Sequence, residues 1–294
     1  MNYNPAIHSS RHLVKNILGN AESILTEIPH PNDELLVLNY HGTPLKFMDN
    51  FKRQLSYFHE KYHFIKPSEL PAYFDKKLTS GKPMMLLTFD DGIRNNLLAA
   101  EVLDQQKISA LFFIVPEFVD AAQELQKDFF IKNIRPSINK EIDSAEEDLT
   151  SFSWEEINML KQHGHEIGSH TMSHTLLSSS APNEKSTYEI SGAAKYISEK
   201  TGQPVISFCS PNDTLSSIGI PEMQLIIKNH QYHFTTYPGT NRTRAPFFIK
   251  RVNVESHWML GVVKRATGIW DRKRWENKRA CFESVLQKAG RAED

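Results

Sequence analysis

The chain has 294 residues, enough for one or two domains of ordinary size or for a single α/β barrel. Its 34 basic and 35 acidic residues nearly cancel, so total charge offers no argument for a nucleic-acid partner. Apolar residues make up 39% of the chain, against 13 glycines and 15 prolines, which excludes collagen-like, low-complexity and wholly disordered proteins. We expect a soluble globular protein.

The lack of a recognisable secretion signal and the small number of cysteines favour a reducing, cytoplasmic location. Residues 1–25 lack the apolar run of a secretory signal. The densest apolar runs, 84–87 and 110–115, are far shorter than the roughly 18 residues needed to cross a bilayer. Cys209 and Cys281 are too few for a disulfide framework and lack CxxC spacing, which also argues against a thiolate metal site.

Short apolar runs alternate with longer amphipathic stretches, the arrangement typical of parallel strands joined by helices. The predicted strands are 35–39, 84–89, 110–115, 166–168, 205–208, 234–236 and 247–254. The predicted helices are 51–62, where apolar residues recur every three or four positions, and 97–105, 153–164 and 184–201. The sequence therefore predicts an α/β sheet or barrel.

No internal repeat and no glycine- or serine-rich linker divides the chain, which favours a single domain. We predict an N-terminal helical extension over 1–32, a catalytic barrel over 33–260 and a C-terminal helical tail over 261–294. Residues 116–152 are irregular and become acidic toward their end. They indicate an insertion over one face of the barrel or, equally, a plain surface loop.

The strongest chemical motif is TFDDG at residues 88–92, which puts two adjacent carboxylates, Asp90 and Asp91, at the end of a buried strand. Successive residues leaving a strand point apart, so one aspartate can bind a metal ion while its neighbour faces a substrate. The carboxyl ends of strands are where α/β proteins carry active sites. An Asp-Gly pair is also common in plain turns, and for this motif alone that alternative stays open.

A second motif, HTMSH at residues 170–174, follows the predicted strand 166–168. Two imidazoles four residues apart, on His170 and His174, can meet one ion from a single helical turn, and Asp91 would add an oxygen ligand. Three protein ligands leave one position open for water, as in catalytic zinc sites.

These motifs, in this order, resemble those of the polysaccharide deacetylases, also called carbohydrate esterase family four. The resemblance extends over residues 36–254. It rests on the segments 38–41, 88–92, 111–114, 154–157 and 164–170, and on Phe208 with Pro211. It implies a distorted (β/α) barrel of about seven parallel strands, in which a divalent metal ion, usually zinc, helps to hydrolyse N-acetyl groups of amino sugars. By position, Asp90 matches the catalytic base, and Asp91, His170 and His174 match the metal ligands.

Two departures from the family pattern affect the predicted site. The family's Arg-x-Pro-Tyr-Gly motif reads CSPND at 209–213, so the arginine that would hold the catalytic carboxylate is missing. The usual C-terminal Leu-x-His, which supplies the general acid, has no match after His174. Some branches of the family look circularly rearranged and carry this histidine on the first strand in a Tyr-His context, which His41 fits. Arg251, at the end of a late strand, is the candidate to replace the arginine.

A competing motif, HEKYH at residues 59–63, matches the HExxH pattern of zinc proteases. The apolar stripe of this helix puts both histidines toward its solvent edge, and Pro83 stands about where a third glutamate ligand would be expected. We therefore favour an exposed helix face. His230 and His233 have no carboxylate motif nearby, and we interpret them as surface or core residues.

The segment 264–279 holds seven basic residues interleaved with Trp270 and Trp275. This composition suits peripheral contact with the inner membrane surface. We favour the alternative, a terminal helix that packs on the barrel and keeps a solvated basic side.

The sequence thus predicts a metal-dependent carbohydrate de-N-acetylase. The resemblance implies that Asp90 takes a proton from the attacking water and that His41 protonates the departing amine. The Asn212 backbone N–H, next to Pro211, would help to hold the oxyanion. The expected partner is an N-acetylated amino sugar in a glycan, glycolipid or nucleotide-sugar intermediate, without nucleic acid. Two alternatives stay open: a catalytically inactive sugar-binding protein on the same fold, and a deformylase-type amidohydrolase.

Overall fold

The structure is a computed structural model that describes residues 30–136, 149–177, 184–211, 218–242, 244–268 and 272–290, with the backbone alone for 272–278. Most of the predicted N-terminal extension, 1–32, lies outside these residues. So does the acidic end of the predicted insertion.

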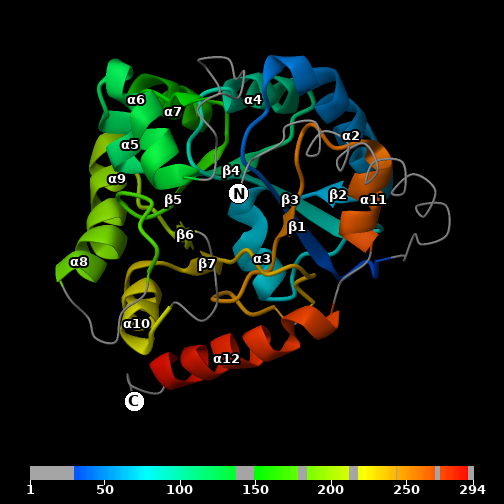
Figure 1. The fold of residues 1–294 in the computed structure, drawn as a ribbon. Helices are drawn as coiled ribbons and strands as arrows, with labels where there is room; N and C mark the ends of the chain where they lie inside the picture. The colour runs from blue at the N-terminus through cyan, green and yellow to red at the C-terminus, as the bar shows by residue number, and fades with distance from the viewer. Residues whose placement is uncertain are drawn as a thin grey trace, which may run out of the picture.

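The described residues contain eight strands in one sheet with parallel pairing throughout, in the order β7-β6-β5-β4-β3-β1-β8, and β2 pairs with β3 beside this path. The strands are β1 (Leu35–Tyr40), β2 (His63–Phe64), β3 (Met84–Phe89), β4 (Ala110–Ile114), β5 (Glu166–Ser169), β6 (Ser207–Cys209), β7 (Tyr232–Phe234) and β8 (Val252–Asn253). A parallel bridge from Phe234 to Ile249, just before β8, brings the two ends of the path together. Helices surround the curled sheet (Figure 1), which confirms the predicted distorted (β/α) barrel and single domain.

The central strands form because their sequences are almost continuously apolar. All residues of β1, β3 and β4 are buried, as expected for parallel strands covered on both faces. Alternate residues of each strand enter two different apolar clusters. Leu36 and Leu38 of β1 join the cluster beneath α2, whereas Leu35 and Val37 join the cluster that includes Phe113 and Phe234 of other strands. The barrel interior is therefore filled with side chains.

The outer layer consists of helices, most of which connect one strand of the sheet to the next. The α-helices are α2 (Met48–Lys61), α3 (Leu70–Phe74), α4 (Asn96–Gln105), α5 (Pro116–Asp120), α6 (Gln123–Phe129), α7 (Trp154–Gln162), α8 (Glu184–Thr187), α9 (Ala193–Thr201), α10 (Ile220–Asn229), α11 (Leu260–Gly268) and α12 (Arg272–Gly290). Short 3-10 turns η1 (Leu45–Phe47) and η2 (Pro67–Glu69) and π-helical turns η3 (Phe130–Ile134) and η5 (Tyr188–Gly192) complete them.

Predicted helix ends are observed where capping residues set them. The Ser153 hydroxyl accepts the Glu156 N–H, and the Glu156 carboxylate accepts the Ser153 N–H in return, so a capping box starts α7. Gly202 ends α9 with φ of 69°, a left-handed value that glycine adopts without strain. The predicted helix 184–201 is observed as α8, η5 and α9 in succession, because a π-helical turn interrupts it.

The late strands differ from their predicted ranges. The prediction 247–254 corresponds to the bridge at Ile249 and the two-residue β8, and 234–236 corresponds to β7, which begins earlier. The short β2 was not predicted. Its position depends on pairing with β3 rather than on its own composition. Within the described residues, no helix is both long and apolar enough to span a membrane.

The last helix, α12, covers the side of the barrel next to β7, whereas α11 packs against α2 and β8. Helix α12 crosses the molecule beside α10 (Figure 1), and the two pack together. Phe282 of α12 is fully buried in a cluster with Phe208 and Phe248. The basic segment 264–279, interpreted as one terminal helix, instead includes the end of α11 and the start of α12, and Phe282 lies just beyond it.

Candidate active site

A polar layer covers the carboxyl end of the barrel interior. Leu35 and Val37 of β1 face the interior, and the two-residue period of a strand puts Asn39 next on that face. The same period on β3 places Thr88 and then Asp90 beyond the apolar interior residues. All three polar residues are buried. Polar side chains, among them the predicted base Asp90, therefore gather where the carboxyl ends of the strands meet.

The two adjacent aspartates have different partners. Asp91 and Gly92 have φ values of 73° and 71°, so the chain turns sharply as it leaves β3. Asp90 stays in the barrel interior, whereas Asp91 faces His170 and His174. The two side chains thus face different surroundings, and both carboxylates are buried, unlike those of a plain surface turn.

Asp91, His170 and His174 form a group whose donor atoms fit one metal ion. The Nε2 atoms of the two histidines lie 3.4 and 3.3 Å from Oδ1 of Asp91. Their Nδ1 atoms donate to the carbonyl oxygens of Cys209 and Asn133, both at 2.8 Å. A carbonyl can only accept, so each neutral ring carries its proton on Nδ1 and presents a lone pair on Nε2. The donor atoms lie within 4.8 Å of one another and are buried, as a three-ligand site requires.

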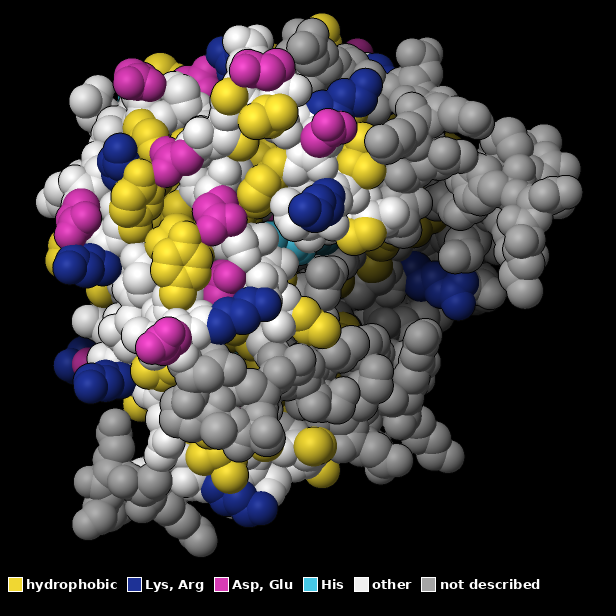
Figure 2. Space-filling model, turned by 60° about the vertical axis from the view of Figure 1, so that its left-hand side comes forward, with side chains coloured by type: hydrophobic (Ala, Val, Ile, Leu, Met, Phe, Trp, Pro, Cys, Tyr) yellow, Lys and Arg dark blue, Asp and Glu magenta, His cyan; other side chains and the backbone are white. Residues whose placement is uncertain are grey.

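Electrostatics keep this group in the form that a cation needs. Burial by itself raises the pKa of Asp91, but hydrogen bonds and charge from His170 and His174 outweigh it and bring the pKa well below its ordinary value. The carboxylate is therefore ionised at neutral pH. On the face shown in Figure 2, a histidine side chain lies at the bottom of a hollow between hydrophobic and charged side chains.

The backbone of the histidine motif differs from the expected helical turn. Residues 170–174 are irregular, and Thr171 and His174 have φ of 64° and 61°. Left-handed conformations are rare for residues other than glycine, above all for β-branched threonine. The prediction of a single helical turn is therefore wrong. The two imidazoles meet Asp91 because the chain doubles back after β5.

Arg251 lies within hydrogen-bonding reach of Asp90, as the sequence predicts. Its Nη1 and Nη2 atoms donate to the two carboxylate oxygens at 2.7 and 2.8 Å, and the side chain is fully buried. It also donates to polar groups of Asn39, Thr88 and Thr235. Burial raises the pKa of Asp90, yet the Arg251 charge and hydrogen bonds more than offset this and lower it. A buried carboxylate with two charge-assisted bonds stays ionised.

Cys209 occupies the position where the family pattern has arginine. It ends β6 inside the barrel, and its Sγ accepts a hydrogen bond from Nη2 of Arg251 at 2.8 Å. A guanidinium from the segment before β8 thus reaches the carboxylate that a β6 arginine would otherwise hold. Asp90, His170 and Cys209 also form a second group of closely spaced donor atoms. The Arg251 charge against two of its members disfavours a cation there.

His41 follows β1 directly and has a partner that the sequence analysis missed. Its Nδ1 lies 3.4 Å from Oε1 of Glu255, which follows β8. Burial lowers the pKa of His41, but Glu255 and the charge of Asp91 outweigh burial and raise it. Glu255 belongs to no recognisable motif. The available signal was topological, because first and last strands become neighbours when a barrel closes, as the pairing of β1 with β8 shows.

The remaining predicted residues have separate outcomes. Pro211 is buried in the turn after β6. Asn212, the predicted oxyanion donor, lies outside the described residues. The described part of the predicted insertion reaches the site, because Asn133 in η3 supplies the carbonyl that accepts from His174. The charge of Arg135, two residues later, acts on both His41 and Glu255.

Other histidines lie apart from this centre. His59 and Glu60 are exposed near the end of α2, whereas His63 belongs to β2, so the HExxH residues do not share one helix. This agrees with the preference for an exposed face over a protease site. His230 and His233 are buried in the core near α12.

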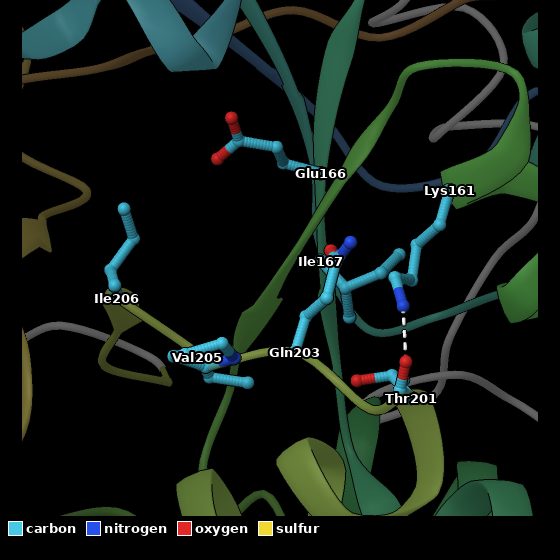
Figure 3. Close-up of a pocket in the computed structure, with 8 residues that line it drawn as sticks. Lys161, Glu166, Ile167, Thr201, Gln203, Val205 and Ile206 are labelled. Carbon is cyan, nitrogen blue, oxygen red and sulfur yellow. Dashed lines mark hydrogen bonds between the residues drawn. The ribbon is translucent and has the colours of Figure 1, made fainter.

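Two surface cavities lie at the opposite, amino end of the strands. One of about 450 Å³ is lined by Lys161, Glu166 and residues just before β6 (Figure 3). The Lys161 ammonium donates to the Thr201 carbonyl across it. Another of about 470 Å³ is lined by residues that include His59 and His63. In barrels of this kind, the amino end of the strands contributes to stability, whereas active sites lie at the carboxyl end.

Comparison with known proteins agrees with the fold and the motifs. The sequence profile described as polysaccharide deacetylase matches residues 77–223, half of the chain. No curated protein gives a significant sequence match. Among solved structures, the Streptococcus pyogenes deacetylase PplD in complex with acetate is 18% identical, with a TM-score of 0.60, 82% of this chain and 99% of that chain covered. IcaB from Ammonifex degensii is 22% identical, with a TM-score of 0.58, covering 80% and 97%. The BpsB deacetylase domain from Bordetella bronchiseptica is 16% identical, with a TM-score of 0.57, covering 78% and 98%.

Proposed function

Because this chain belongs to the polysaccharide deacetylase family, we propose that it is a metal-dependent hydrolase that removes an N-acetyl group from an amino sugar. The substrate class is a glycan, glycolipid or nucleotide-sugar intermediate. The observation that carries the proposal is the division of labour between the adjacent aspartates. Asp91 faces two imidazole Nε2 atoms, while Asp90 is held by Arg251 in the same buried layer.

The residues that would hold a divalent ion are Asp91, His170 and His174. Two neutral imidazoles and one carboxylate suit zinc, which is the expected ion. When bound, such an ion polarises the amide carbonyl and makes water more acidic. Backbone carbonyls fix both histidine rings in the required tautomer, so the side chains need little rearrangement when a metal ion binds.

Asp90 acts as the general base. It accepts a proton as the water oxygen adds to the carbonyl carbon of the acetamide. Arg251 lowers the pKa of Asp90, which keeps this carboxylate ionised and ready to accept. Both oxygens of Asp90 are bonded to the guanidinium, so the base is also fixed in orientation.

His41 acts as the general acid. The carbon–nitrogen bond of the amide breaks as the imidazolium gives its proton to the departing amine, and acetate and the free amino sugar are released. Glu255 faces Nδ1 of His41, which directs Nε2 toward the substrate. Pro211 and the Asn212 backbone N–H are the proposed contacts for the oxyanion.

The alternatives make different demands on the same residues. A catalytically inactive sugar-binding protein needs no buried base beside a metal group, so the Asp90–Arg251 pair argues against it. A deformylase-type amidohydrolase would use the same residues on a smaller acyl group. The chain is proposed to act in the cytoplasm, and peripheral membrane contact through the basic segment 264–279 remains a sequence-based prediction.

One experiment tests the proposal. Metal content of the purified protein is measured together with release of acetate and formate from N-acylated nucleotide sugars and oligosaccharides. We expect one equivalent of divalent metal and release of acetate, and both should be lost in Asp91→Asn. Formate release alone would favour the deformylase, and tight sugar binding without either product would favour the inactive binder.

A further inference from the structure

A buried glutamate outside the catalytic motifs holds the turn that carries both histidines. Ser173 lies within this turn, between His170 and His174. Its backbone N–H and its hydroxyl both donate to Glu189, at 2.9 and 2.6 Å. Glu189 is 2% exposed and belongs to η5, on the helical segment that follows the turn. One carboxylate therefore accepts from both hydrogen-bond donors of one turn residue.

The turn needs such an anchor because its backbone is unfavourable on its own. Thr171 and His174, on either side of Ser173, are both left-handed. Residues in this region keep that conformation only where surrounding contacts over-determine it. The side chain of Thr171 does not help, because its buried Oγ1 has no hydrogen-bond partner among the described residues.

Backbone contacts fix the beginning of the turn, whereas contacts that involve side chains fix its end. The His170 N–H donates to the Ile114 carbonyl, and the Met172 carbonyl accepts the Glu117 N–H. Beyond Met172, the His174 ring donates to the Asn133 carbonyl and the Ser173 hydroxyl lies 2.8 Å from the Thr175 hydroxyl. The backbone just before His174 is held by Glu189, which accepts the Ser173 N–H. The position of His174, the second imidazole, therefore depends on Glu189 more than that of His170 does.

The π-helical turn explains how Glu189 reaches this place. A π turn inserts an extra residue into a helix, and such insertions are frequent at functional sites. Within η5, a Cβ on Gly192 would lie 3.7 Å from the Cε atom of Met172, so the histidine turn packs directly on this part of the helix. The bulge thus brings a carboxylate against Ser173.

We propose that Glu189 is a positioning residue that sets metal affinity by holding His174 in place through Ser173. The inference rests on the proposed function, since it concerns how Asp91, His170 and His174 would share an ion. Groups that orient metal ligands typically change affinity by about 10- to 100-fold when removed. A carboxylate that merely packs the helix would affect folding without affecting affinity for the ion.

The test compares zinc affinity by chelator competition in wild-type protein, Glu189→Gln, Ser173→Ala and the double variant. We expect Glu189→Gln, which keeps the shape of the side chain, to weaken zinc binding by about 10- to 100-fold. Ser173→Ala should have a smaller effect, because its backbone N–H still donates to Glu189. The two effects should be non-additive, since they remove one shared contact. Hydrogen exchange of the Ser173 amide without metal should quicken in Glu189→Gln.

Tyr188→Phe serves as the matched control on the same turn. It removes the bond from the Tyr188 hydroxyl to Glu117, and zinc affinity should stay at the wild-type value. If wild-type protein binds zinc and Glu189→Gln binds it with the same affinity, the positioning role of Glu189 is overturned and the proposed function is not. If wild-type protein binds no divalent ion, the proposed function fails together with the inference. If Glu189→Gln does not fold, Ser173→Ala decides, and unchanged zinc affinity there would overturn the proposal.

Discussion

Two groups of buried or partly buried histidines in this barrel have opposite electrostatic character. At the carboxyl end of the strands, His41 and His174 have raised pKa values, because carboxylates outweigh the effect of burial. Beside α12, burial lowers the pKa of His230 to about 4 and that of His233 to about 3. His174, His230 and His233 are all buried, and the His41 side chain is 20% exposed. The difference lies in whether a carboxylate faces the ring.

This contrast separates chemistry from packing. His233 bonds through Nε2 to the Ser210 hydroxyl at 2.6 Å and packs against Phe208 and Phe282. His230 packs against Phe208 with ring centroids 5.0 Å apart. Neither histidine has an acidic partner among the described residues, so both serve as neutral core side chains. A histidine becomes a candidate acid or ligand here only when Asp91 or Glu255 lies against it.

The largest effect is expected from the base itself. Asp90→Asn keeps the shape of the side chain but cannot accept a proton, so turnover should fall by roughly 10²–10⁴-fold. Metal content should be unchanged, because Asp90 is outside the Asp91 group. Acetate release and metal analysis of the same preparation check both points. Near-normal turnover would remove Asp90 from the role of base.

Next in size is the loss of the buried cation. Arg251→Met leaves Asp90 ionised and without its partner, which typically costs about 3–5 kcal/mol of folding stability. Chemical denaturation at pH 7 measures this loss. Arg94→Met is the matched control, since Arg94 forms a half-exposed ion pair with Glu156 at 2.8 Å. Such surface pairs contribute about 0–1 kcal/mol. Equal losses of folding stability in the two variants would contradict the conclusion that the buried Arg251–Asp90 pair stabilises the fold.

The histidines beside α12 should make the fold sensitive to acid. Their folded-state pKa values, about 4 and about 3, lie below the ordinary value of 6.5, so the unfolded chain binds more protons. Their contribution is therefore fully present above pH 6.5 and is lost as the pH falls from 6.5 toward about 4 for His230 and about 3 for His233. For His230 the loss approaches about 3 kcal/mol, at about 1.4 kcal/mol per pKa unit.

Denaturation midpoints between pH 7 and pH 4.5 test this expectation. His230→Gln should flatten the pH dependence, because the uncharged amide does not titrate. An unchanged slope in that variant would show that the acid sensitivity arises elsewhere, for example in the carboxylates at the other end of the barrel.

The sequence predicts the central strands and the motif residues better than the contacts made by barrel closure, and the reasons are physical. Strands β3 and β4 are recognisable because continuous apolar runs are required in a covered parallel sheet. Asp90, Asp91 and both histidines are recognisable because they occur in short motifs beside such strands. Arg251 is recognisable only as a replacement for the arginine missing at Cys209.

What the sequence conceals depends on closure of the barrel. Glu255 lies beside His41 because β8 pairs with β1, a contact between segments more than 200 residues apart. The turn at 170–174 looks helical by spacing, yet tertiary bonds hold Thr171 and His174 in left-handed conformations. Long-range hydrogen bonds override local preference in both places, and no local pattern records them.

A smaller effect is expected from the acidic partner of His41. Glu255→Gln removes the charge that raises the pKa of His41, so the imidazole loses its proton at lower pH. The general acid must be protonated, and the alkaline limb of the pH–rate profile should therefore move to lower pH. The rate at the optimum should fall by about 10-fold, since the ring keeps its place but loses part of its orientation. A profile that moves to higher pH would contradict the pairing.

The smallest effect is expected at the histidine that looks most like a ligand by motif. His59→Ala should leave metal content and turnover at wild-type values and change stability by no more than about 0.5 kcal/mol, as for ordinary surface substitutions. His59 is exposed, and its motif partner His63 lies on β2 rather than on the same helix. Its main contact is a stacking against Phe64 at 5.9 Å between ring centroids, near the amino end of the strands. His174→Ala provides the matched comparison, since loss of metal there and retention in His59→Ala would locate the ion at the carboxyl end. Loss of one metal equivalent in His59→Ala would instead restore the protease interpretation and overturn the contrast between the two ends of the barrel.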